Sequence, residues 1–440
     1  MASIYASASV TLIAAAGQDA EHGLQGVSRD WDTPDFCALS DRYQLIDVGR
    51  RATQTIEKST WYSRAWTFQE CYFARRRVYF LANTARIDCA KDLKRYKEDY
   101  PRPVDFLNML AALPNNAHAS YAIPLMMQEY TRRRLTYDSD ALNAIIGALE
   151  SRPEIDHTWG VHVERLDKPN SIISSICCCN AVLYRSSWVQ SLAFYSQSIR
   201  SRWRRTRHAE TSASGLYIAL HWYHASPGPR RKDFPSWSPL GWRSQVSHLA
   251  CDDTSVSSAC SLQVWHNGNF KTLRDTFGVL SEQHRQIAPK ESKYLKLETR
   301  VVILDFEHVD SSASYSAGLY VKVPYGEELD ILVLPDWDLD YGIEQQTPGE
   351  KIQLPCIVVV RQTRLSLESP RIEDELQIII LHHEGSYYER VGCFSVWGSS
   401  SWFARDKHGQ TMNPNIRELR RYGNGRFWMK NGEQRTILLG

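Results

Sequence analysis

The pattern of hydrophobic and polar residues is densest between residues 61 and 80. Ser59, just before this stretch, is a residue type that favours the start of a helix. On a helix, the large side chains of the stretch fall into two neighbouring stripes: Trp61, Ala65, Phe68 and Tyr72, and then Trp66, Gln69 and Phe73. We therefore predict a helix over residues 61–77 that packs on more than one side and ends in the cations Arg75–Arg77, followed by a strand over 78–81.

Shorter hydrophobic segments flank this helix. Residues 1–7 are predicted as helix and Val10–Ala15 as a buried strand, rather than a signal peptide, because the start has no Lys or Arg and its apolar run is brief. Tyr43–Val48 is a second predicted strand, and Arg86–Cys89 is predicted to extend the pairing. The alternation of strand and helix predicts an α/β layer over residues 1–90.

From residue 91 to residue 228 the pattern predicts a mainly helical connecting region, interrupted by prolines. Asp138–Asp140 is a cap cluster, and the apolar residues after it recur at the spacing of one helix face: Leu142, Ile145, Ile146 and Leu149. We expect Ile172–Leu183 to be buried and Leu216–Tyr223 to be helical. The breaker Ser226–Pro229 marks a boundary.

After residue 234 the pattern changes to β-type runs separated by Gly, Pro, Asp and Ser. These runs are Val301–Phe306, Leu319–Val323, Leu329–Leu334, Ile352–Arg361, Leu376–His382 and Tyr388–Val396. Their spacing predicts an antiparallel β-rich domain over residues 229–440, built as a sandwich or an open barrel. The whole chain is therefore predicted to be α+β, with an incomplete α/β layer at the N-terminus.

Composition narrows the class of protein. The chain has 440 residues and a net charge of +2, which gives no electrostatic case for nucleic acid or an anionic membrane as the main partner. No apolar run is long enough to span a bilayer. The ten cysteines, including the triplet Cys177–Cys179, form no zinc-type pair of pairs and suit reduced thiols in a cytoplasmic protein.

Four segments, taken in order, resemble the fungal heterokaryon-incompatibility (HET) domain proteins. The segments are Met1–Ala8 running into Val10–Ala15, Arg64–Glu70, Tyr130–Leu142 and Phe234–Trp242. They are similar to the family's Met-x-x-Ile-Tyr helix and its strand, to its Arg-x-Trp-Thr-hydrophobic-Gln-Glu motif, to a recurring downstream block and to a Pro-Ser-Trp-Ser segment.

The chain also departs from the family pattern. Members carry an early Leu-Ser-Tyr-x-Trp-Gly block and then a Trp-Ile-Asp-x-x-Cys-Ile-Asn-Gln block, and neither occurs in this sequence. The resemblance therefore implies the back half of a HET domain, through either a misassigned gene start or a truncated gene. Loss of central strands would leave an exposed sheet edge.

Glu70 is the weak candidate for a catalytic residue, with Arg64 beside it. The HET domain has been likened to TIR-type domains, some of which cleave NAD with a helix glutamate, and a carboxylate among aromatics gains a raised pKa that suits acid–base work. The alternative is a structural Glu70 that pairs with Arg64 or caps a backbone group. The motif core is Trp61, Arg64, Trp66, Phe68, Gln69 and Glu70.

Other candidate sites are weaker. His221 and His224 have the spacing of two ligands on one helix face but lack a third, and His382 and His383 point to opposite faces of a strand. Arg202–Arg207 is expected to be a solvated surface segment rather than an RNA contact. We therefore predict no metal and no cofactor.

The resemblance implies an effector or regulator of non-self recognition and programmed cell death that acts on other proteins through direct contacts. Two alternatives stay open at this point: a TIR-like hydrolase that cleaves NAD with Glu70, and an inert fragment of a degenerate gene.

Overall fold

The computed structural model describes a little under three-fifths of the chain. The described residues are 2–32, 36–40, 43–46, 52–89, 119–151, 156–163, 220, 222–224, 227–248, 255–258, 260–266, 268–272, 293–310, 317–325, 329–338, 351–365, 372–396, 402–406, 411–412 and 431–440. The predictions for Ile172–Leu183, Cys177–Cys179 and Arg202–Arg207 lie outside these residues.

The chain divides into two compact units. The first comprises Met1–Ala117 and Glu129–Pro153, and the second comprises His118–Gln128 and Glu154–Gly440. The division into residues 1–90, 91–228 and 229–440 that we expected from the sequence stays a prediction. Each unit is described separately below.

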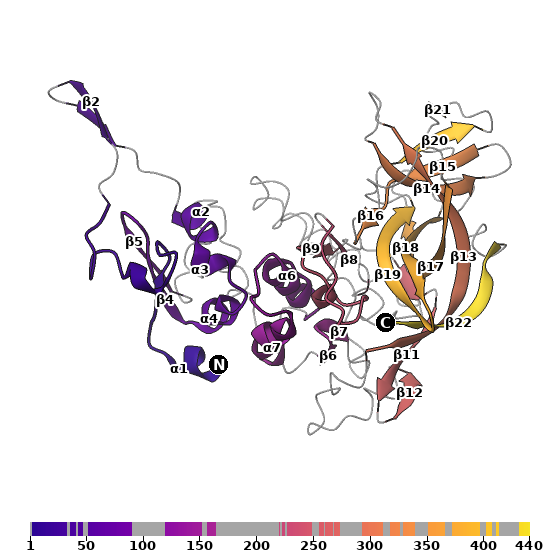
Figure 1. Cartoon of the computed structure of the whole chain (residues 1–440), viewed down its shortest axis with the longest axis horizontal. Coiled ribbons are helices and arrows are strands. Elements are labelled where there is room, and N and C mark those ends of the chain that lie inside the picture. Colours follow the sequence, from indigo (N-terminus) through magenta and orange to yellow (C-terminus); the bar gives the residue numbers. More distant parts are fainter. Residues whose placement is uncertain are drawn as a thin grey trace. The chain divides into compact units, whose positions relative to one another are not determined.

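The first unit contains a three-stranded sheet with the order β1-β4-β5, in which β1 runs parallel and β5 antiparallel to β4. Its elements are α1 (Ala2–Ser7), β1 (Thr11–Ala14), η1 (Ala20–His22), β2 (Phe36–Ser40), β3 (Tyr43–Ile46), α2 (Ala52–Glu57), α3 (Thr60–Ser63), α4 (Thr67–Phe73), β4 (Arg76–Phe80), β5 (Ala85–Cys89), η3 (Asp138–Asp140) and α7 (Asn143–Glu150). Figure 1 shows α1 to α4 and the sheet in indigo to purple. The predicted order of helix, strand, helix, strand is confirmed.

A small apolar core holds this sheet to the helices. It consists of Ile13, Ala15, Ile56, Tyr62, Cys71, Tyr79 and Leu81, with Trp61 packed against it. The prediction that residues 10–15 form a buried strand is only half right, because Ile13 is buried whereas Leu12 is 58% exposed. One face of β1 therefore packs on the core and the other faces outward.

The single helix predicted over residues 61–77 is wrong. The chain leaves helical geometry at Arg64, whose backbone is extended with φ −84° and ψ 134°, and α4 begins only at Thr67. The predicted cationic helix end is wrong as well, because Arg76 and Arg77 lie in strand β4. Burial of Phe68 follows the predicted stripe, while Trp61 and Tyr72 are half-buried.

Helix α6 (Ala119–Thr131) divides between the units at Gln128. In the first unit, the predicted cap cluster is the 3-10 turn η3, and α7 buries Ile145 and Leu149 as its spacing predicts. In the second unit, residues 222–224 form strand β8, so the part of Leu216–Tyr223 that is described is not helical.

The second unit is dominated by one 13-stranded sheet. Its strands are β10 (Ser255–Ser258), β11 (Ser261–His266), β12 (Asn269–Thr272), β13 (Leu295–Val309), β14 (Gly318–Tyr325), β15 (Leu329–Val333), β16 (Asp336–Trp337), β17 (Lys351–Leu365), β18 (Ile372–Glu384), β19 (Tyr387–Val396), β20 (Trp402–Asp406), β21 (Thr411–Met412) and β22 (Glu433–Leu439). Smaller elements are β6 (Asp156–Thr158), β7 (Val161–Val163), β8 (Trp222–His224), η5 (Pro239–Gly241) and β9 (Val246–His248).

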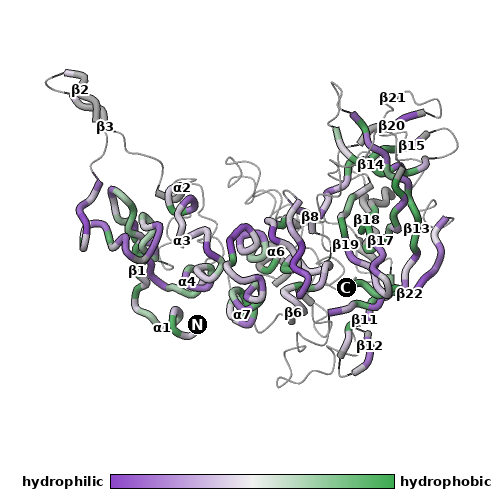
Figure 2. The backbone as a smooth tube through the Cα atoms, in the orientation of Figure 1, coloured by the Kyte–Doolittle hydropathy of each residue, from purple (hydrophilic) through white to green (hydrophobic). Residues whose placement is uncertain are grey.

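Pairing closes part of the large sheet on itself. Strand β13 pairs with both β17 and β22, while β17, β18 and β19 form a meander and β19 meets β22 through one parallel pair, Tyr388 with Leu439. These five strands therefore form a ring around a core that includes Phe306, Ile378 and Phe394. Figure 2 shows hydrophobic colouring along β14 and β18.

The predicted fold class, α+β with a β-rich antiparallel C-terminal region, is confirmed. All six hydrophobic runs predicted as strands lie within or closely overlap β13, β14, β15, β17, β18 and β19. In the described part of the chain, no helix is both long and apolar enough to cross a bilayer.

Candidate functional site

The motif core is positioned by a tight break between α3 and α4. The Ser59 side chain caps α3 by accepting a hydrogen bond from the Tyr62 N–H at 3.1 Å. The buried Thr67 hydroxyl lies 2.7 Å from the carbonyl oxygens of both Trp61 and Arg64. Its single hydrogen can be shared between them where α3 ends, and the Trp61 carbonyl also accepts from the Arg64 N–H at 3.2 Å.

Glu70 lies on the side of α4 that faces Trp61. Its Oε2 accepts a hydrogen bond from the Trp61 indole N–H at 3.0 Å. The pKa of Tyr5 is raised, first by partial burial and then by the Glu70 carboxylate, to which the Tyr5 hydroxyl is hydrogen-bonded. The carboxylate thus accepts from α1 and from α3, and neither contact is the pairing with Arg64 that we weighed from the sequence.

The other polar motif residues tie α4 to the region after α6. The Trp66 indole N–H donates to Asp140 Oδ2 at 3.2 Å, and the Gln69 amide donates to the Asn143 carbonyl at 3.0 Å. A Cβ at Gly147 would lie 2.4 Å from Gln69 Oε1, which explains a glycine in the middle of α7. The motif therefore fixes α7 against α4.

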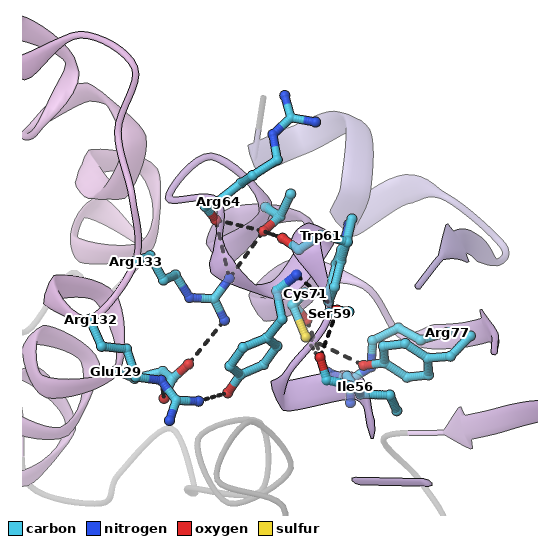
Figure 3. A network of polar contacts seen from close by, with 12 residues as sticks. Ile56, Ser59, Trp61, Arg64, Cys71, Arg77, Glu129, Arg132 and Arg133 are labelled. Carbon is cyan, nitrogen blue, oxygen red and sulfur yellow. Dashed lines mark hydrogen bonds and ion pairs between the residues drawn. The ribbon is translucent and has the colours of Figure 1, made fainter. Parts of the chain in front are cut away.

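Two cations, Arg132 and Arg133, lie over the ring of Tyr62; Figure 3 shows both arginines beside Glu129. The guanidinium carbons of Arg132 and Arg133 lie 4.7 Å and 4.2 Å from the Tyr62 ring centroid. Buried Glu129 neutralises both groups, with distances of 2.8 Å to Arg132 Nε and 3.0 Å to Arg133 Nη2. Burial, then the Glu129 charge, raises the pKa of the Tyr62 phenol, so Tyr62 is a neutral donor or acceptor.

Arg133 connects this network to the helix break. Its Nη1 donates to the Thr67 hydroxyl at 3.1 Å. A second buried guanidinium, Arg77, donates to the Cys71 carbonyl at 3.2 Å and to the Cys71 Sγ at 3.0 Å. These contacts hold α3, α4, β4 and the end of α6 together.

Arg64 differs from the rest of the motif core. Its backbone forms a parallel bridge with Arg134, but its side chain is exposed and points away from the network in Figure 3. Trp61, Trp66, Gln69 and Glu70 all have polar partners inside the unit, and Phe68 is fully buried. The structure therefore brings together every motif side chain except that of Arg64.

A separate polar centre lies in the second unit, at the Pro-Ser-Trp-Ser segment. Arg390 and Asp338 are fully buried and paired at 2.7 Å. Arg390 also donates to the carbonyls of Leu220 and Trp222, and its guanidinium stacks 3.5 Å from the Trp222 ring centroid. The Ser236 hydroxyl accepts from the Arg390 N–H at 2.8 Å, so the segment is anchored to β19.

His224 belongs to this buried centre. It lies on strand β8, which overturns the expectation of two imidazoles on one helix face. Its ring packs against Trp222 and Trp242, and its Nε2 lies 3.7 Å from Asp338 Oδ1. The residues that the structure describes contain no group of three potential metal ligands.

Sequence reasoning missed the ionised residues that hold both centres. Glu129 lies on α6 and Arg133 lies two residues beyond its end, four residues from Glu129, a salt-bridge spacing that could have been read from the sequence. Asp338 and Arg390 are 52 residues apart and carry no local signal.

Comparison with known protein families gives a match at the start of the first unit. The family model described as heterokaryon incompatibility protein (HET) matches residues 1–70, which end on Glu70 of the motif. No curated protein and no solved structure matches the chain. Residues 1–70, from α1 into α4, are therefore similar to the HET family.

Proposed function

We propose that this HET-type protein is an effector or regulator of fungal non-self recognition, and that it triggers growth arrest and cell death through contacts with other proteins. The observation that carries the proposal is the family match over residues 1–70. The internal contacts of the motif support it, because Trp66, Gln69 and Glu70 are engaged in building the unit. We therefore propose that the protein acts by binding other proteins, and that it does so in the cytoplasm.

The test is conditional expression of the whole chain in a filamentous fungus. We expect hyphal growth to stop and a membrane-impermeant dye to enter the cells after induction. Glu129→Gln, which removes the charge that neutralises Arg132 and Arg133, should reduce the arrest because it loosens the HET-type unit. The matched control is Glu21→Gln, which alters an exposed carboxylate of the same unit.

Normal growth of cells that accumulate the folded wild-type chain would overturn the proposal and favour an inert protein. Equal arrest by wild type and a demonstrably unfolded Glu129→Gln chain would also count against it, since toxicity would then not depend on the HET-type unit.

A further inference from the structure

Arg64 is the one motif side chain that the fold of the first unit does not use. Its carbonyl accepts from Thr67 and Arg133, so the backbone at this position is fixed. Its guanidinium is exposed, and none of the described residues offers it a carboxylate. A charged side chain on a fixed backbone is well placed to bind a partner of opposite charge.

Arg134 lies opposite Arg64 across the parallel bridge. The Arg134 N–H donates to the Ser63 carbonyl at 2.6 Å, and the Ala65 N–H donates to the Arg134 carbonyl at 2.8 Å. Side chains of residues paired in this way leave the backbone from the same side. Arg134 is also exposed and has no carboxylate partner within the described part of the chain.

Arg64 and Arg134 thus place two exposed cations on paired backbone, and none of the described residues forms an ion pair with either. Glu129, the buried carboxylate nearby in sequence, is already occupied by Arg132 and Arg133. Like charges directly opposite each other destabilise paired backbone segments. A bound anion would remove this repulsion, and two planar guanidinium groups suit carboxylates in particular because each can donate two parallel hydrogen bonds.

We propose that Arg64 and Arg134 form a two-guanidinium site that binds an acidic peptide segment of a partner protein. This inference rests on the proposed function and gives the partner its chemistry. An acidic peptide fits better than a nucleic acid, because nucleic-acid affinity depends on many phosphate contacts whereas this chain has a net charge of only +2.

The test uses the full chain and a short fluorescent oligoglutamate peptide, with an oligoglutamine peptide as the neutral probe. Fluorescence anisotropy at low ionic strength should show binding of oligoglutamate alone, because exposed ion pairs are screened by salt. Arg64→Gln with Arg134→Gln should weaken this binding about fivefold or more, as expected for two lost ion pairs. Arg64→Lys with Arg134→Lys, which keeps the charge and loses the forked donors, should give an intermediate affinity.

The matched control is Arg75→Gln with Arg76→Gln, which removes two exposed arginines elsewhere in the same unit. An equal loss of affinity in this control, or equal binding of oligoglutamine, would overturn the proposal. So would more effective competition by duplex DNA than by unlabelled oligoglutamate. Urea midpoints of the Gln variants that are no lower than that of the wild type show that a loss of binding is not a loss of folding.

The growth assay separates this proposal from the proposed function. A wild-type chain that binds oligoglutamate but does not arrest growth would overturn the function alone. A chain whose Arg64→Gln and Arg134→Gln form still arrests growth, after losing peptide binding, would overturn the acidic partner alone.

Discussion

At the scale of single residues, Glu129 is the carboxylate that compensates the charges of Arg132 and Arg133 in the first unit. It is 3% exposed and faces Arg133, whose side chain is fully buried. Glu129→Gln should lower the free energy of unfolding by about 3–5 kcal/mol, because removing one partner leaves a buried charge uncompensated. Urea denaturation followed by tryptophan fluorescence measures this, with Glu21→Gln as the control. A loss no larger than that of the control would mean that the Arg133 charge is neutralised in another way.

Glu70 is the second residue whose charge should contribute to the stability of the first unit. Glu70→Gln should cost about 1.5–3 kcal/mol of stability, because the carboxylate accepts from the Trp61 N–H and from Tyr5. Trp61→Phe should cost part of the same energy, and the double variant should show non-additivity.

The same variant tests the NAD alternative. If Glu70 serves only as this acceptor, NAD incubated with the purified chain should be consumed at the same background rate by wild type and by Glu70→Gln. Turnover that the wild type shows and the variant lacks, at a temperature where both are folded, would instead make Glu70 catalytic.

At the scale of elements, the break between α3 and α4 is stabilised in part by one hydroxyl, that of Thr67. Thr67→Val keeps the shape of the side chain but removes the group that bonds the carbonyls of Trp61 and Arg64 and accepts from Arg133. We expect a loss of about 1–3 kcal/mol, the cost of leaving buried polar groups unsatisfied. Thr67→Ser restores the hydroxyl and should recover most of the loss; equal denaturation midpoints for Val and Ser would contradict this role.

The same break shows where sequence reasoning succeeded and where it could not. The stripe through Ala65 and Phe68 predicted burial correctly, because periodicity reports which side of an element packs. It could not predict extended backbone at Arg64, because the partner that replaces the helical hydrogen bonds is Arg134, which is remote in sequence. Likewise, the apolar strands of the second unit were found from their pattern, whereas the closure of β13 onto both β17 and β22 depends on tertiary pairing.

At the scale of the whole molecule, each compact unit contains a buried ion pair, but the groups around the two pairs differ. In the first unit, the buried carboxylate of Glu129 pairs with two arginines, Arg132 and Arg133. In the second unit, two titratable groups act electrostatically with the Arg390–Asp338 pair. The pKa of His224 is lowered and the pKa of Asp336 is raised. Stability of the second unit should therefore depend on pH in a way that single substitutions can expose.

The sign follows from the two pKa shifts. Burial lowers the pKa of His224 below its usual 6.5, with the Arg390 charge in the same direction and Asp338 opposing, so its contribution to stability is lost as pH falls below 6.5. Burial, then the charge of Asp338, raises the pKa of Asp336 from 3.8 to about 6, so its contribution is fully present below 3.8 and is lost as pH rises through about 6. In the wild type these two trends oppose each other between about pH 6 and pH 4.

Removing either group should therefore leave the pH dependence of stability that the other group causes. As pH falls from 6 towards 4, Asp336→Asn should lose stability relative to the wild type, whereas His224→Gln should gain it. Hydrogen exchange of peptides from residues 227–248 reports on the second unit, and Asp233→Asn, an exposed aspartate in that segment, is the control. Parallel pH profiles for all four chains would mean that neither group changes its proton affinity on folding, and that the buried pair of Asp338 and Arg390 does not act on its neighbours.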